Sequence, residues 1–399
     1  MSRKVLLIEP KYKNKYPPMG LMKLATYYRK QGDNVRFFKG DLKVFAAQLL
    51  CEEFLEKVSD PKMGKYVSKL VEHIRRGNFT PLDAIPDFRD TDREDLLKAY
   101  RLRYKNGDFP KFEVVCITTL FTFYWRETIE TINFAKQFCA ENGRMIVGGI
   151  AATILQEQVL QETGIDPICG LLNRRGMLDK DNKDIIDELP LDYSILEESD
   201  YTYPANNAYF AYMTRGCPRN CPFCAVPRLE PDYKDYVGLK KQIEKATERF
   251  GPMKDLLLMD NNVFASKHFN KIIDEIKACG FEHGATYIPA SEYEIAMKNL
   301  KEGFNVRGYT RKFIKLYDQI SSRLKEEAQA DFYLQREERN LLYPEVATTE
   351  DIISFDDIAR PLYEKHFKQT KRMRIIDFNQ GVDARLVDDA KMEKLAEIN

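Results

Sequence analysis

The feature of this sequence that most limits its fold is a set of short, continuously apolar segments separated by helical stretches. A strand that is apolar at every position must be buried on both of its faces. The N-terminal part, residues 1–185, is therefore predicted to be an α/β domain whose parallel sheet is covered by helices on both sides. Its strands are expected at residues 5–8, 34–38, 114–118 and 145–147, with a helix at 21–31.

A second α/β region is predicted to follow a linker at residues 186–206, where acids, prolines and tyrosines are scattered without a sustained period. This region, residues 207–399, has four expected strands, and four strand–helix units are too few to close a β/α barrel. We expect a partial, truncated barrel, because an uncovered parallel edge would favour aggregation. The strands are expected at 207–213, 256–259, 285–288 and 374–378, and the helices at 239–250, 268–279 and 391–398.

Two long charged segments interrupt these regions, at residues 42–111 and 292–372. Both are rich in helix-forming residues and too long for ordinary connections, so each is predicted to be a helical insert. Pro81, Pro86 and Pro110 mark breaks in the first insert. The basic run at 360–374 is interpreted as a solvated helix face; the alternative is a patch for an anionic substrate.

The composition excludes several classes of partner. Lys plus Arg and Asp plus Glu both number 62, so no net charge draws the chain to nucleic acid or to an anionic membrane. No apolar run is long enough for a membrane span, and the N-terminus does not have the pattern of a signal peptide. A cytoplasmic location is expected. Eight cysteines in 399 residues are too few for a disulfide scaffold.

Three of these cysteines form a compact motif directly after a predicted strand. Cys217, Cys221 and Cys224 are separated by three and two residues, a spacing that lets one loop wrap a metal site. Three thiolates leave one iron of a cubane cluster without a protein ligand, where an external chelating molecule can bind. The alternatives are a structural zinc site, for which the next His or Cys along the chain is as distant as His268, and three unrelated buried thiols.

The motif resembles that of the radical S-adenosylmethionine (SAM) superfamily, in which an aromatic residue precedes the last cysteine, as Phe223 does here. The resemblance implies a 4Fe–4S cluster whose free iron is chelated by SAM. It also implies reductive cleavage of SAM to methionine and a 5′-deoxyadenosyl radical, with electrons from a donor such as flavodoxin or ferredoxin. The substrate stays unknown, because in this superfamily it is recognised by the C-terminal half of the barrel and by elements beyond it.

Two further polar segments follow predicted strands of the second region. Asp260, Asn261 and Asn262 resemble the family segment that binds the SAM amino group, and the alternative is a turn with a helix cap. Residues 377–385 resemble the region after the fourth strand, which reaches the SAM ribose and carboxylate. This segment adds Gln380, Asp383 and Arg385 to the expected SAM contacts, and the cysteine motif adds Phe223. The alternative for Asp383 and Arg385 is a turn with a salt bridge in solvent.

The N-terminal part resembles the Rossmann-like cobalamin-binding domain that precedes the barrel in many radical SAM proteins. Thr118, Gly148 and Gly149 occupy strand ends where such a domain contacts its ligand, and glycines let backbone approach a large flat molecule. The Asp-x-His-x-x-Gly segment that supplies a histidine to cobalt is absent; Glu9 to Lys13 stand in its place. The resemblance therefore implies either cobalamin without a histidine ligand or a domain that has kept only a structural role.

Three functions remain open from the sequence. The first is a radical SAM enzyme that methylates an unreactive carbon with cobalamin. The second is a rearrangement or cyclisation enzyme that works without cobalamin; sulfur insertion is disfavoured because the sequence has no second cysteine triad. The third is a non-catalytic iron–sulfur binding protein.

Overall fold

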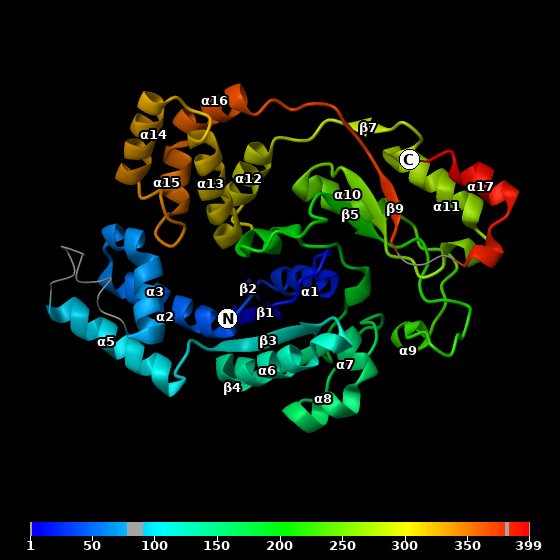
Figure 1. Cartoon of the computed structure of the whole chain (residues 1–399), viewed down its shortest axis with the longest axis horizontal. Coiled ribbons are helices and arrows are strands. Elements are labelled where there is room, and N and C mark those ends of the chain that lie inside the picture. Colours follow the sequence, from blue (N-terminus) through cyan, green and yellow to red (C-terminus); the bar gives the residue numbers. More distant parts are fainter. Residues whose placement is uncertain (1, 78–90, 380–382, 399) are drawn as a thin grey trace.

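The computed structural model describes residues 2–77, 91–379 and 383–398 and contains two parallel sheets (Figure 1). Buried side chains of both sheets belong to one hydrophobic core. The first sheet has the order β2-β1-β3-β4, and every pair is parallel. All four predicted strands of the N-terminal part are confirmed. Their bounds are β1 Lys4–Glu9, β2 Asn34–Lys39, β3 Phe112–Thr119 and β4 Cys139–Gly149.

This first sheet is covered on both faces, as its apolar strands predict. Val5 and Leu7 of β1 belong to one hydrophobic core with α1, whereas Leu6 and Ile8 belong to a second core with α2. Successive side chains of a strand point to opposite faces, so each face of β1 receives alternate residues. The helices of this part are α1 Met19–Lys30, α6 Trp125–Ala135, α7 Ile150–Ile154 and α8 Gln156–Thr163.

The first insert is helical, as predicted. Its elements in the described residues are α2 Leu42–Val58, η1 Pro61–Tyr66, α3 Val67–Arg76 and α5 Thr91–Asn106. The Asp41 carboxylate accepts the Lys43 backbone N–H at 2.8 Å and so caps the start of α2. Pro81 and Pro86, which were expected to mark a break, lie outside the described residues.

The second sheet has three strands, in the order β5-β6-β9, all parallel. The prediction of four strands in one parallel sheet is wrong, because β7 pairs antiparallel with β8 instead. The chain leaves for the second insert after β7 and returns through β8, so the two ends of the insert meet as a short ribbon and β9 takes the place beside β6. The strands are β5 Ala208–Ala211, β6 Asp255–Leu258, β7 Thr286–Tyr287, β8 Arg372–Met373 and β9 Ile376–Phe378.

The helices of the second region lie close to their predicted positions. The two long ones, α10 and α11, pack on the sheet through residues such as Ile243 and Ile273, which belong to the same core as Leu256 of β6. The elements are α9 Val226–Leu229, α10 Lys240–Phe250, α11 Phe269–Ile276 and α17 Asp389–Leu395.

The second insert is a helical subdomain with its own apolar core around Phe313, Tyr317 and Phe355. It lies on the same side of the molecule as the first insert (Figure 1), and the Arg307 guanidinium reaches Glu52 of α2 at 3.4 Å. Its helices are α12 Glu292–Lys301, α13 Val306–Ser321, α14 Glu326–Glu338, α15 Thr349–Ser354 and α16 Asp356–His366. No helix in the described residues combines the length and apolar character needed to cross a membrane.

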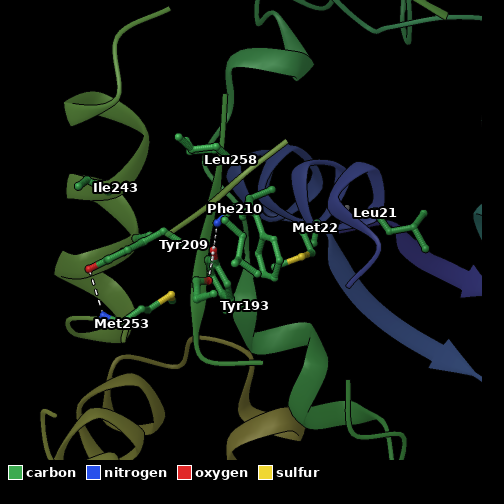
Figure 2. Close-up of a cluster of buried hydrophobic side chains, with 14 of the residues drawn as sticks. Leu21, Met22, Tyr193, Tyr209, Phe210, Ile243, Met253 and Leu258 are labelled. Atoms are coloured by element: carbon green, nitrogen blue, oxygen red, sulfur yellow. Dashed lines mark hydrogen bonds between the residues drawn. The ribbon is translucent and has the colours of Figure 1, made fainter. Parts of the chain in front are cut away.

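The predicted linker at 186–206 packs between the two sheets. Figure 2 shows Tyr193 of this segment against Phe210 of β5 and near Met22 of α1. The Tyr193 hydroxyl donates to the Ala208 carbonyl at 3.1 Å and accepts the Phe210 N–H at 3.3 Å. One continuous apolar core therefore runs from α1 through the linker to β5 and β6.

Candidate functional site

The predicted site residues of the second region gather at one edge of its sheet. The cysteine loop follows β5, Asp260 to Asn262 follow β6, and Asp383 and Arg385 follow β9. Because the three strands are parallel, their carboxyl ends meet at the same edge, which is where ligands bind in such sheets. Gln380 lies outside the described residues.

The cysteine loop begins at a glycine that no other residue could replace without strain. Gly216 has φ of +67°, and a Cβ there would lie 2.8 Å from the Glu230 carbonyl oxygen. Beyond it, Cys217 and Cys221 are half-buried, Cys224 is exposed, and all three are free thiols. Phe223 is 92% exposed. The loop thus presents its thiols and its aromatic side chain at the surface of the sheet edge.

The three thiols are spread along the loop. Within residues 2–77, 91–379 and 383–398, no three Cys, His, Asp or Glu side chains converge on a point that could hold one metal ion. In a cubane cluster each thiolate binds a different iron, so the loop does not have to bring its thiols to one point. The type and number of ligands, three cysteine thiols, therefore fit a cubane cluster that keeps one iron open.

Asp260 joins the end of β6 to the end of β5. Its buried carboxylate accepts the Met213 N–H at 2.9 Å and the Thr214 hydroxyl at 2.7 Å, and it also accepts the Thr214 N–H. Burial raises the pKa of Asp260 to about 6, against the lowering effect of these hydrogen bonds. The carboxylate thus holds the strand from which the cysteine loop starts.

The raised pKa of Asp260 gives a pH-dependent stability. The folded protein binds this proton more tightly than the unfolded chain, so the contribution of Asp260 is greatest below the ordinary pKa of 3.8 and is lost as the pH rises through about 6. Asparagine does not titrate, so the unfolding free energy of Asp260→Asn should rise relative to that of the wild type as the pH increases. The difference between the two proteins should change by up to roughly 3 kcal/mol across this range. Urea denaturation of both proteins between pH 4 and pH 7.5 measures it, and a difference independent of pH would contradict it.

Asn261 and Asn262 face the cysteine loop in different ways. The Asn261 side-chain amide donates to the Glu230 carboxylate at 3.2 Å. The Asn262 amide nitrogen lies 3.7 Å from the Cys217 sulfur, while its buried Oδ1 has no hydrogen-bond partner among the residues that the structure describes. A buried acceptor without a donor is unfavourable. Asn262 therefore offers a free acceptor beside the first cysteine, suited to an N–H or O–H group of a ligand.

Asp383 and Arg385 are paired with each other and with the cysteine loop. The Asp383 carboxylate receives the Arg385 Nε at 2.8 Å and the Arg219 Nε at 2.5 Å. These contacts, that of Arg385 foremost, lower the pKa of Asp383. Arg219 lies between Cys217 and Cys221, so an ion pair with a residue that was not predicted joins the segment after β9 to the loop. The Asp383–Arg385 pair, at the start of the 3-10 turn Ala384–Leu386, is the salt bridge in a turn that was the alternative to a SAM contact.

Sequence reasoning missed a buried row of charges beneath the loop. Lys23 of α1 donates to the Asp187 carboxylate at 2.8 Å, and Arg215 lies 3.5 Å from Asp187 and 3.2 Å from Glu230. Glu230 also accepts the Gly216 N–H at 2.7 Å. The position of Arg215 in Thr-Arg-Gly-Cys, two residues before the first cysteine of the motif, is the sequence signal that could have indicated these charges. The row ties the first helix of the chain to the cysteine loop.

The predicted cobalamin-contacting residues lie together at the carboxyl end of the first sheet. Thr118 of β3 is paired with Gly148 of β4. Gly149 has φ of +107°, and a Cβ there would collide with the Thr119 backbone, so the close packing of β3 and β4 already requires this glycine. Phe123, whose ring stacks on Phe121 with centroids 4.8 Å apart, is exposed after β3.

This end of the first sheet adjoins the cysteine loop. Helix α7, which follows Gly149, packs against α9, which follows Cys224 (Figure 1). The backbone supports this arrangement, since the Gly170 N–H donates to Thr153 of α7 at 2.9 Å and Gly170 lies near the Leu229 carbonyl of α9. The two groups of predicted residues, which come from separate sheets, are thus neighbours.

A cavity of about 660 Å³ lies elsewhere, between β2, α2 and the start of α13. None of the predicted site residues that the structure describes lines it. Its charged walls pair with each other, as Arg36 does with Glu52 at 2.6 Å and Arg311 with Asp200 at 2.6 Å. The cavity therefore does not identify a ligand.

No protein-family model and no curated protein sequence matches this chain. Among solved structures, two of the radical S-adenosylmethionine methyltransferase TsrM from Kitasatospora setae are similar. One has cobalamin and a [4Fe–4S] cluster bound, and it is 14% identical with a TM-score of 0.39. The other, with tryptophan substrate and the SAM analogue aza-SAM bound, is 13% identical with a TM-score of 0.39. Each match covers 70% of this chain and 51% of the TsrM chain, so the chain spans about half the length of these structures.

Proposed function

We propose that this chain is a radical SAM enzyme. In this proposal Cys217, Cys221 and Cys224 hold a 4Fe–4S cluster, and cobalamin bound at the carboxyl end of the first sheet serves methylation of an unreactive carbon. When bound, these groups supply one-electron cleavage of SAM to a 5′-deoxyadenosyl radical and a carrier for the methyl group. The observation that carries the proposal is the three-thiol loop at the carboxyl end of a parallel strand, beside a buried acceptor for which the described part of the chain supplies no donor.

The residues around the loop have separate tasks in this proposal. The three thiolates leave one iron for the SAM amino and carboxylate groups. Asn262 Oδ1 would accept a hydrogen bond from bound SAM, because it is buried and has no donor within the described protein. Arg385, whose side chain is 69% exposed, retains donors that could meet the SAM carboxylate. Phe223 would cover the ligand as it enters.

The cobalamin part of the proposal rests on the contact between α7 and α9. A methyl carrier and a radical source must act on one substrate, so their sites have to adjoin. Gly148 and Gly149 lie at the end of β4, which leads into α7, and Thr118 of β3 pairs with Gly148. The stacked rings of Phe121 and Phe123 offer an apolar surface nearby. An electron donor of the flavodoxin or ferredoxin class is proposed as the partner.

A second candidate keeps the radical chemistry and omits cobalamin, giving a rearrangement or cyclisation enzyme. The observation in its favour is that the packing of β4 against Thr119 explains Gly149 without any ligand.

The test begins with anaerobic reconstitution of the wild type with iron and sulfide. Dithionite and SAM are then added, and 5′-deoxyadenosine is measured by mass spectrometry beside a Cys221→Ala variant. We expect 5′-deoxyadenosine from the wild type alone. A cluster that forms without SAM cleavage would contradict the proposal and favour a non-catalytic iron–sulfur protein. A cobalamin titration of the same protein, followed by its visible spectrum, separates the first candidate from the second.

A further inference from the structure

Two arginines share one carboxylate next to the cysteine loop. Arg219 belongs to the loop itself, and its Nε lies 2.5 Å from Asp383 Oδ2. Arg385 approaches the same carboxylate with Nε at 2.8 Å from Oδ1 and Nη2 at 3.2 Å from Oδ2. The Asp383 side chain is 10% exposed, and its carboxylate contacts both guanidinium groups. The arrangement fastens the middle of the cysteine loop to the segment that follows β9.

The charges of this group do not cancel. Two guanidinium groups and one carboxylate leave a net charge of one positive unit. The positive charge lies beside the cysteine loop, since Arg219 is part of the loop and Arg385 binds the same carboxylate as Arg219. Arg219 is two residues from Cys221 in the chain.

A cubane cluster bound by three thiolates carries net negative charge, and this charge grows when the cluster accepts an electron. A fixed positive charge nearby stabilises the reduced form more than the oxidised form, and net charge near the cluster is among the factors that set its reduction potential. In this position the two arginines can therefore affect the electron-accepting step itself as well as the shape of the loop.

We propose that Arg219, Asp383 and Arg385 form a clamp that holds the cysteine loop and whose uncompensated arginine charge raises the reduction potential of the cluster. This inference rests on the proposed function, because it requires a cluster on Cys217, Cys221 and Cys224. Arg385 is a positioning and electrostatic residue here. The step that it influences is the transfer of one electron from an external donor to the cluster, in which no covalent bond changes.

The experiment is a redox titration of the reconstituted cluster with dithionite, followed by electron paramagnetic resonance. SAM is omitted, so that contacts between Arg385 and SAM do not contribute. The variants are Arg385→Gln, Arg385→Lys and Asp383→Asn. Arg385 is 69% exposed, so its substitution should leave the fold intact. The matched control is Arg126→Gln, which removes an arginine charge from α6, where the Arg126 side chain is 91% exposed and pairs with Glu130.

The clamp predicts shifts of opposite sign. The midpoint potential should move to more negative values in Arg385→Gln, stay near wild type in Arg385→Lys and Arg126→Gln, and move to more positive values in Asp383→Asn. If the clamp had a purely structural role, the midpoint potentials of Arg385→Gln and Asp383→Asn would shift in the same direction. An unchanged potential in Arg385→Gln, or shifts of equal sign in Arg385→Gln and Asp383→Asn, would overturn the inference. Failure of the wild type to assemble any cluster would instead overturn the proposed function.

Discussion

Replacing any one of Cys217, Cys221 and Cys224 with alanine is expected to reduce bound iron to background and to abolish 5′-deoxyadenosine formation. A cubane that already lacks one protein ligand cannot lose a second without exposing another iron to solvent. The loop offers no substitute thiol, because the other five cysteines lie outside residues 217–224. Iron and sulfide content after anaerobic reconstitution, with 5′-deoxyadenosine measured beside it, tests this expectation.

The matched control for this series is Cys279→Ala. Cys279 is a half-buried thiol in the segment after α11, and burial raises its pKa to about 11, so it stays protonated and is a poor metal ligand. This variant should keep the iron content and the 5′-deoxyadenosine yield of the wild type. If a single loop variant retained the wild-type iron content, the assignment of the three ligands would be wrong.

Replacing Asp187 with alanine is expected to lower the free energy of unfolding by about 3–5 kcal/mol. Asp187 is the shared partner of Lys23 and Arg215, and both cations are largely buried, with side chains 12% and 6% exposed. Burial alone would raise the pKa of Asp187, but Lys23 and Arg215 lower it overall, so the carboxylate is charged and stabilising at neutral pH and loses this effect as the medium becomes acidic. Urea denaturation at pH 7.5 measures the loss.

Asp184→Ala provides the comparison. Asp184 lies in the same segment and pairs with Lys30 at 2.8 Å, but the Lys30 side chain is 57% exposed. A solvated pair of this kind contributes at most about 1 kcal/mol. Equal losses of unfolding free energy in the two variants would show that the buried charges from Lys23 to Glu230 stabilise the fold no more than a solvated ion pair does. A large loss in Asp187→Ala alone, together with weaker cluster retention, would show that the first helix of the chain supports the cysteine loop.

The sequence by itself determined those features that depend on neighbouring residues. The continuous apolar run at Val5 to Ile8 requires burial on both faces and hence a covered parallel sheet, which the two cores around β1 confirm. Both inserts were recognisable as helical from their composition. The spacing of Cys217, Cys221 and Cys224 placed three thiols on one loop after a strand, because seven residues of chain cannot separate them widely.

The tertiary structure alone decided how distant segments meet. Strand β7 has the apolar pattern of a sheet strand, yet it pairs with β8, because the return of the second insert brings residue 372 beside residue 287. Asp260 has the local pattern of a turn or a ligand contact, and only the adjacency of β5 and β6 turns its carboxylate toward Met213 and Thr214.

The same holds for the charges beneath and beside the loop. Lys23 and Asp187 are 164 positions apart in the chain, and Arg219 and Asp383 are equally separated in sequence. Whether such charges pair depends on which buried surfaces the folded chain brings together. The periodicity of a sequence reports only on the face that each residue presents. The chemistry of the loop could therefore be inferred from local spacing, whereas the groups that hold and charge it required the fold.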